Sequence, residues 1–155
     1  MIDTPQIIQT TAQATAFIHL TVTPEEMMRV FGPTIGELMG ALAAQGITPA
    51  GPVFAHHLRR PTDTFDFEVS VAVSAPRKAA GRVLPGEWPA MRVARTVHHG
   101  PYEGLPAAWG DFMDWIETHG HTQAPDLYEC YLTNPEEHPD PATWRTELNR
   151  PLQVS

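Results

Sequence analysis

Three segments in the first half of the chain have the hydrophobic pattern of strands. Residues 15–23 and 64–73 alternate between polar and apolar side chains, a period of two that is typical of a half-buried strand. Residues 51–60 are interpreted as a third strand, followed by a turn. The apolar face of 64–73 is expected to lie beneath a helix, and it consists of Phe65, Phe67, Val69, Val71 and Val73.

Between the first two of these strands, apolar residues recur at helical spacing over 27–42. Thr23 precedes this stretch as a predicted N-cap, with Pro24 at the first helical position and two glutamates in the first turn. Gly46 is expected to end the helix in a left-handed conformation. We expect the Gly32–Pro33 pair to break or kink the helix, because proline lacks the N–H that a helix interior uses.

The second half repeats the order strand, helix, strand, strand. Residues 88–99 are predicted to form a strand. Gly100–Pro101 fits a strand-to-helix corner, at the start of a helix that ends near Gly120. Residues 126–132 and 143–152 are predicted to be the closing strands.

The two halves also match residue by residue. GITPAGPVFAHHL, which begins at Gly46, aligns with GHTQAPDLYECYL, which begins at Gly120. We predict one α+β domain of two pseudo-symmetric repeats, residues 14–74 and 87–152, joined by a linker at 75–86. The antiparallel strands are expected to form one sheet with both helices on one face.

The composition limits the classes of function. The 155 residues include 18 acidic and 10 basic side chains, which gives a formal net charge of −8. This charge opposes a nucleic-acid backbone and is compatible with a cationic small molecule as partner. Cys130 is the only cysteine, which excludes an internal disulfide and a cysteine-rich zinc site. No segment has the pattern of a signal peptide or a membrane span, and we expect a cytoplasmic protein.

Two pairs of adjacent histidines raise the question of a metal site. His98 and His99 lie in one predicted strand, and His56 and His57 lie in another. Neighbouring residues of a strand point to opposite faces, so neither pair can chelate one ion through a shared face. The sequence also has no recognisable zinc spacing. We therefore predict no metal and no other cofactor, and Tyr102 is the residue of HHGPYE that we retain as a candidate for function.

Six segments carry a family resemblance that extends over residues 14–152. They are HHGPYEGLPAAW, WIETHG, YECYLTNP and TELNRP in the second half, and GITPAGPVFAHH and FDFEVSVAV in the first. In these segments the chain resembles the GyrI-like family, the effector-binding domain of AraC- and MerR-type multidrug regulators of bacteria. That family has a SOUL-like fold and also occurs as a stand-alone protein. No helix-turn-helix precedes these segments, so we expect a stand-alone form without direct nucleic-acid binding.

The resemblance implies a site as well as a fold. It implies a cleft between the two repeats, on the sheet face away from the helices. Members of the family bind amphipathic, often cationic small molecules there, using aromatic side chains and a central glutamate. Some stand-alone members resemble hydrolases of electrophilic toxins that use a tyrosine and a glutamate in the same cleft.

The strand DLYECYL contains the best candidate for the central glutamate. Its alternation places Glu129 and Tyr131 on one face and Cys130 on the other. We expect the face of Cys130 to be buried under the helices and the face of Glu129 to line the cleft. The repeat places Ala55 and His57 at the equivalent positions, and the small Ala55 leaves room opposite Glu129.

Four more residues are candidate ligand contacts. Trp88 and Trp144 have polar neighbours in the sequence and are candidates for aromatic walls, whereas Trp109 belongs to the second predicted helix and is assigned to the core. Glu68 and Glu147 occupy equivalent positions in the two repeats. Each can contact a ligand or pair with an arginine across the sheet. The candidate arginines are Arg92, Arg95 and Arg145.

Three functions remain open at this stage. The leading hypothesis is a small-molecule-binding protein whose Glu129 attracts a cation, with cation–π support from aromatic walls. The second is a metal-independent hydrolase in which Glu129 positions or deprotonates water and Tyr131 donates a proton. The third is an interaction module that binds a protein partner, such as gyrase, by its surface.

Overall fold

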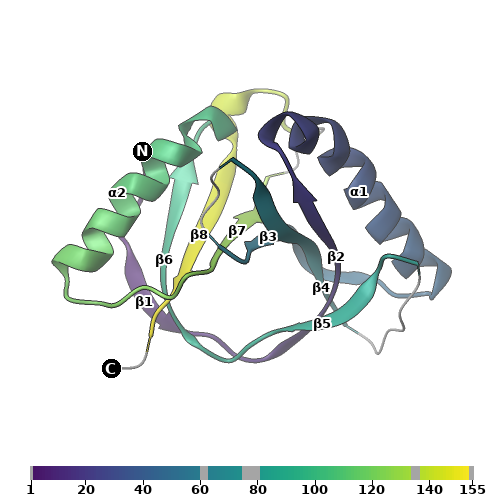
Figure 1. The fold of residues 1–155 in the computed structure, drawn as a ribbon, viewed down its shortest axis with the longest axis horizontal. Helices are drawn as coiled ribbons and strands as arrows, with labels where there is room; N and C mark the ends of the chain where they lie inside the picture. Colours follow the sequence, from purple (N-terminus) through teal and green to yellow (C-terminus); the bar gives the residue numbers. More distant parts are fainter. Residues whose placement is uncertain (1, 60–62, 75–80, 134–136, 154–155) are drawn as a thin grey trace. The chain divides into compact units, whose positions relative to one another are not determined.

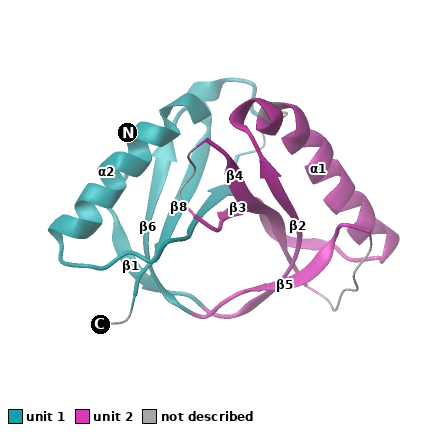
Figure 2. Cartoon of the chain, viewed as in Figure 1, with its two compact units in different colours: residues 1–10, 91–155 teal, residues 11–90 magenta. Residues whose placement is uncertain are grey.

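The computed structural model describes residues 2–59, 63–74, 81–133 and 137–153, and the chain divides into two compact units. Unit 1 contains residues 1–10 and 91–155, and unit 2 contains residues 11–90 (Figure 2). Within the described residues, each unit has four antiparallel strands and one α-helix. The α+β class predicted from the sequence is therefore confirmed.

The strands of unit 2 are β2 (Gln13–Val22), β3 (Pro49–His57), β4 (Phe65–Val73) and β5 (Leu84–Trp88). β4 pairs with β3 and β2, and β2 also pairs with β5, which gives the order β3-β4-β2-β5 (Figure 1). The expected linker therefore contributes residues 84–86 to the edge strand β5, and its residues 75–80 lie outside the described part of the chain.

The strands of unit 1 are β1 (Gln6–Gln9), β6 (Arg92–His99), β7 (Leu127–Tyr131) and β8 (Arg145–Pro151). Their order is β1-β6-β8-β7. Unit 2, read from its own edge strand, has the equivalent order β5-β2-β4-β3, so the predicted pseudo-symmetry is confirmed. Neither edge strand pairs with the strand that follows it in the chain. β1 is followed by β2 but pairs with β6, and β5 is followed by β6 but pairs with β2.

α1 (Pro24–Ala44) begins and ends as predicted. The Thr23 hydroxyl accepts the N–H of Glu26 at 3.2 Å, and the Glu26 carboxylate accepts the N–H of Thr23 at 3.0 Å, which completes a capping box. Gly46 follows the helix with φ +69°. Of the break or kink expected at Gly32–Pro33, the break is wrong, because α1 is continuous through both residues. A proline removes one hydrogen bond of the ladder, and the packing of a 21-residue amphipathic helix outweighs that loss.

α1 packs on the face of the unit 2 sheet that alternate residues of β2 and β4 form. Phe31 of α1 stacks on Phe67 of β4, with ring centroids 6.4 Å apart. Phe67, Val69 and Val71 are fully buried. This confirms the prediction that the apolar face of β4 lies beneath the first helix.

The corner after β6 leads into a short 3-10 helix, η1 (Tyr102–Gly104), and then into α2 (Leu105–Thr118). Gly100 has φ +121°, a conformation that favours glycine, as a tight strand-to-helix corner requires. α2 packs over Leu127 of β7 and Leu148 of β8 to form the core of unit 1. A second 3-10 helix, η2 (Pro141–Thr143), precedes β8. Neither α1 nor α2 combines the length and hydrophobicity needed to cross a membrane.

Two details of the strands differ from the prediction. The segment 88–99 is two strands, because Trp88 ends β5 in unit 2 and Arg92 begins β6 in unit 1. Pro89 follows Trp88 and cannot donate to a strand ladder, so the interruption has a local cause. β1 was not predicted, since it has only four residues and none of them is fully buried.

Candidate functional site

Glu129 of β7 is a buried acidic residue, with 9% of its surface exposed. Its Oε2 accepts a hydrogen bond from the indole Nε1 of Trp109 at 2.7 Å, and its Oε1 accepts one from the hydroxyl of Tyr131 at 3.2 Å. Both donors are neutral, so these hydrogen bonds stabilise the carboxylate without cancelling its negative charge.

Glu129 and Tyr131 lie on the face of the unit 1 sheet that α2 covers. The register partner of Glu129 is Leu148, which is fully buried in the core beneath α2, and its donor Trp109 belongs to α2 itself. The prediction that Cys130 faces the helices and Glu129 faces away is therefore wrong. Four consecutive residues of β7 are buried, so polarity along this strand did not indicate which face the helix covers.

Three aromatic rings form a cluster beside this carboxylate. The ring centroids of Tyr102 in η1 and Tyr131 in β7 are 5.8 Å apart, and those of Tyr102 and Trp144 are 4.8 Å apart. Tyr102 is 36% exposed, so the cluster extends from the buried Glu129 to the protein surface. The structure thus brings together four of the residues selected from the sequence: Tyr102, Glu129, Tyr131 and Trp144.

Burial and the charge of Glu129 both raise the pKa of the hydroxyls of Tyr102 and Tyr131. Burial raises the pKa of Tyr131 well above its ordinary value, and the nearby Glu129 carboxylate raises it further. The pKa of Tyr102 is raised for the same two reasons, with burial again the larger cause. Both hydroxyls therefore stay protonated at neutral pH and can act as hydrogen-bond donors.

This arrangement has two chemical capacities. A carboxylate beside aromatic rings attracts a cation, because the ring faces and the carboxylate both carry negative potential. A protonated phenol hydrogen-bonded to a carboxylate is also a pair of the kind used in general acid–base chemistry.

Trp109 is a site residue that sequence reasoning assigned only to the core. It is 8% exposed and belongs to the core cluster under α2, so the core assignment is confirmed. Its indole N–H nevertheless reaches Glu129. A buried tryptophan needs an acceptor for that N–H, and this requirement is the signal that could have linked Trp109 to a buried carboxylate.

Glu147 of β8 belongs to a polar network on the opposite face of the unit 1 sheet. Its Oε1 lies 3.4 Å from Nε of Arg95 and accepts a hydrogen bond from Nδ2 of Asn149 at 3.0 Å. Arg95 also donates to Oδ1 of Asn149 at 2.6 Å. Of the two alternatives that the sequence left open for Glu147, the arginine pair is present.

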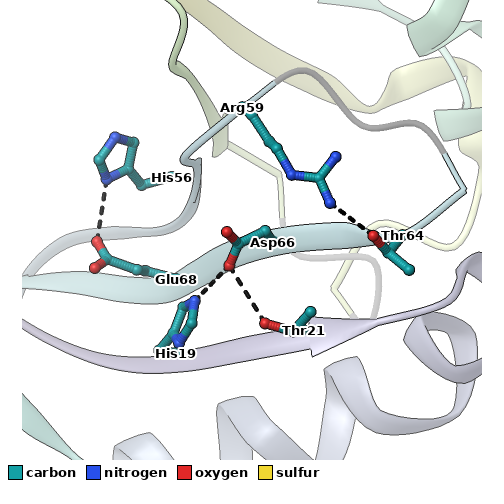
Figure 3. A network of polar contacts seen from close by, with 7 residues as sticks. All are labelled: His19, Thr21, His56, Arg59, Thr64, Asp66 and Glu68. Carbon is teal, nitrogen blue, oxygen red and sulfur yellow. Dashed lines mark hydrogen bonds and ion pairs between the residues drawn. The ribbon is translucent and has the colours of Figure 1, made fainter.

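Glu68, the equivalent of Glu147 in unit 2, pairs with a histidine instead. Its Oε1 lies 3.0 Å from Nδ1 of His56 on β3 (Figure 3). Asp66, the next residue on the same face of β4, contacts Nε2 of His19 on β2 (Figure 3). Because Asp66 and Glu68 flank the buried Phe67, both acid–histidine pairs lie on the face that α1 does not cover.

Trp88 also lies on this face of unit 2. It makes an edge-to-face contact with Phe54 of β3, with ring centroids 5.1 Å apart. Phe54 is two residues from His56 on the same strand and therefore shares its face. Glu68 and Trp88, both selected from the sequence, thus lie on one face of the same sheet.

Ala55 and His57 lie on the opposite face of β3, beneath α1. Their register partners on β4 are the fully buried Val69 and Phe67, and His57 stacks on Phe67 with ring centroids 5.3 Å apart. The pair Ala55–Val69 in unit 2 corresponds to Glu129–Leu148 in unit 1, as the repeat predicted.

The adjacent histidines at the end of β6 have opposite surroundings, as predicted. His98 is 3% exposed on the α2 side, whereas the exposed His99 lies 3.0 Å from the carboxylate of Asp3. Within the described ranges, no group of three or more histidine, cysteine, aspartate or glutamate side chains is placed to hold a metal ion.

A protein-family model and several solved structures match this chain. The model of the GyrI-like small molecule binding domain matches residues 3–153. The C-terminal domain of EcmrR is 22% identical in sequence, with a TM-score of 0.86 and coverage of 98% of both chains. In the EcmrR–DNA complex the TM-score is 0.84, and this chain spans 58% of the EcmrR chain.

Two more distant structures share the fold. SAV2435, solved bound to tetraphenylphosphonium, has a TM-score of 0.67 at 8% identity, with coverage of 97% of this chain and 94% of that one. A hydrolase encoded by lin2189 from Listeria innocua has a TM-score of 0.65 at 13% identity, with coverage of 96% and 91%. A search of curated protein sequences gave no significant match. The family model covers nearly the whole chain, and the chain therefore belongs to the family of GyrI-like small-molecule-binding domains.

Proposed function

We propose that this domain binds an amphipathic, cationic small molecule at the site formed by Glu129, Tyr131, Tyr102 and Trp144. The observation that carries the proposal is a buried carboxylate in direct contact with an aromatic cluster that reaches the surface. A cation brought beside Glu129 gains Coulomb attraction, which surroundings of low polarity strengthen.

The aromatic cluster favours a cation that also has a large apolar body. Trp144 contacts Tyr102, and Tyr102 contacts Tyr131, the hydrogen-bond donor to the carboxylate. A cation over a ring face of this cluster gains about 0.5–2 kcal/mol. The same rings bury apolar surface of the ligand. A small hydrated cation uses only the first of these contributions, so the site selects amphipathic cations.

The related structures support this ligand class. SAV2435 was solved with tetraphenylphosphonium, a cation with a large aromatic body. EcmrR was solved in a complex with DNA. We propose that the present domain serves multidrug recognition linked to transcription regulation.

A calorimetric titration with tetraphenylphosphonium tests the proposal. The neutral control is triphenylphosphine oxide, which has three of the same aromatic rings and no formal charge. We expect the cation to bind at least about tenfold more tightly than the oxide, a difference of about 1.4 kcal/mol. Equal affinity for the two compounds would remove the role of the carboxylate.

A hydrolase remains the alternative function, and one observation favours it. The Tyr131 hydroxyl donates to Glu129 over 3.2 Å, so a phenol and a carboxylate lie within hydrogen-bond distance of each other. Glu129 could position or deprotonate water while Tyr131 protonates the leaving atom of a strained electrophile. Turnover of an epoxide or cyclopropane substrate by the wild type, lost in Tyr131→Phe, would establish this alternative.

A further inference from the structure

Three polar residues form one row across the α2-covered face of unit 1. In the strand register, Thr146 of β8 is the direct partner of His98 on β6 and of Tyr131 on β7. Direct partners in adjacent antiparallel strands project to the same face, with Cβ atoms about 4.5–5.5 Å apart. The row His98–Thr146–Tyr131 therefore extends the Glu129 site across three strands.

One contact of the His98 ring shows that its Nε2 carries a proton. Its Nε2 lies 3.1 Å from the carbonyl oxygen of Pro101. A carbonyl only accepts hydrogen bonds, so Nε2 carries the proton. In the neutral imidazole Nδ1 is then an acceptor.

Gly104 of η1 holds this ring in place. A Cβ atom at residue 104 would lie only 2.9 Å from Cε1 and 3.2 Å from Nε2 of His98. The ring is thus fixed between its strand and η1, the element that carries Tyr102.

Two buried polar atoms of this row have no hydrogen-bond partner among the described residues. They are Nδ1 of His98, which is 3% exposed, and Oγ1 of Thr146, which is fully buried. Buried polar atoms in proteins are almost always satisfied by protein groups or by ordered water. Because His98 and Thr146 are direct partners in the register, one small polar group placed between their side chains would satisfy both atoms.

We propose that His98 and Thr146 form a polar subsite that binds a single O–H group. A hydroxyl can donate to Nδ1 of His98 and accept from the hydroxyl of Thr146 through one oxygen atom. An amide N–H can donate but its nitrogen cannot accept, and an ether can accept but cannot donate, so neither satisfies the acceptor Nδ1 and the donor Thr146 together. In the free protein the O–H group is a water molecule, and in the complex it is a hydroxyl of the ligand.

This subsite refines the ligand class and rests on the proposed function, because its row ends at Tyr131 beside Glu129. The ligand that the whole site fits best is an amphipathic cation that carries a hydroxyl group on a short arm. Glu129 and the aromatic cluster hold the charged body, and the subsite discriminates between hydroxyl and methyl at the end of the arm.

A matched pair of phosphonium ions tests the subsite. The probes are (2-hydroxyethyl)triphenylphosphonium and propyltriphenylphosphonium, which differ by one hydroxyl in place of one methyl. We expect the wild type to bind the hydroxyl compound about threefold to tenfold more tightly, as one net hydrogen bond allows. Thr146→Val keeps the shape of the side chain, and it should abolish this preference while both compounds still bind.

Thr34→Val is the matched control, because Thr34 is a buried threonine of α1 in unit 2. It should leave the preference for the hydroxyl compound unchanged. A wild type without this preference, or a Thr146→Val variant that retains it, would overturn the role of the subsite in ligand recognition.

The free protein gives a second measurement that does not depend on cation binding. A high-resolution crystal structure should contain one ordered water within about 2.7–3.2 Å of both Nδ1 of His98 and Oγ1 of Thr146. A direct contact between these atoms, or no water between them, would contradict the subsite. If neither phosphonium binds but the water is present, the proposed function fails and the subsite stands.

Discussion

Trp109 and Glu129 are joined by a hydrogen bond of 2.7 Å between the indole N–H and a carboxylate oxygen. This bond connects the buried face of α2 with β7, and it makes one side chain part of both the core and the candidate site. The folding of unit 1 and the orientation of the carboxylate are therefore coupled. A change at Trp109 should affect stability through its hydrogen bond as well as its packing.

Trp109→Phe tests this coupling. Phenylalanine keeps part of the ring packing but has no N–H, so one oxygen of the buried carboxylate loses its donor. We expect the free energy of unfolding to fall by about 1–3 kcal/mol from the lost hydrogen bond, with a further loss from the smaller ring. Urea denaturation at pH 7 measures the change. The control is Trp115→Phe, on the same helix, and an equal loss in the two variants would show that the bond to Glu129 contributes nothing.

The tyrosines of the site should give the protein an alkaline stability limit. The folded-state pKa of Tyr131 lies above the unfolded value of about 10, because burial and Glu129 disfavour the phenolate. The unfolded chain therefore loses this proton first as the pH rises. The contribution of protonated Tyr131 to the free energy of unfolding is therefore complete below pH 10. It declines as the pH rises from 10 towards the folded-state pKa.

Urea unfolding at pH 9 and pH 11 measures this decline, and absorbance near 295 nm reports phenolate directly. We expect Tyr131→Phe to have a smaller difference in stability between the two pH values than the wild type. An unchanged difference would mean that burial of Tyr131 does not control its ionisation.

Local signals in the sequence predicted much of the fold. The capping residue Thr23, the glycine at 46 and the alternation of 64–73 each depend on neighbours along the chain, and the structure confirms all three. The break at Pro33 was wrong because the packing of the whole helix outweighs one lost hydrogen bond.

The candidate site was only partly predictable for a different physical reason. The residue types at Glu129 and Tyr131 indicated a site, but the face they occupy depends on where α2 packs. β7 is buried on both faces, so its polar pattern contains no information about that choice. Thr146 and His98 were not selected, because their unsatisfied atoms become visible only when three strands are aligned.

Glycine substitutions in and after α1 should have opposite effects. A Cβ atom added at Gly36, inside the helix, would meet no atom within 4 Å. Gly36→Ala should therefore stabilise the protein by about 0.5–1 kcal/mol, because alanine restricts the unfolded chain. Gly46→Ala should destabilise it by about 1 kcal/mol, since residue 46 has φ +69°. Thermal unfolding of both variants measures whether each substitution raises or lowers the stability. A loss of stability in Gly36→Ala would contradict the continuous helix.

Glu129→Gln provides the sharpest test of charge recognition. Glutamine has nearly the same shape, its amide oxygen can accept from Trp109, and its amide nitrogen can donate to the oxygen of Tyr131. The substitution therefore removes the charge while the local hydrogen bonds can be kept. We expect affinity for tetraphenylphosphonium to fall more than about tenfold, or about 1.4 kcal/mol, while affinity for triphenylphosphine oxide changes little. Calorimetry measures both.

The control for this substitution is Glu147→Gln, which removes an equal charge from the other face of the same sheet, where Glu147 pairs with Arg95. If cation affinity depended only on the net charge of −8, the loss of one negative charge would reduce this affinity equally in both variants. A specific effect requires the large loss in Glu129→Gln alone, because Glu129 contacts the aromatic cluster through Tyr131 whereas Glu147 pairs with Arg95. If Glu129→Gln binds the cation as tightly as the wild type does, the carboxylate is a structural partner of Trp109, and Glu68 on unit 2 becomes the acidic residue to test.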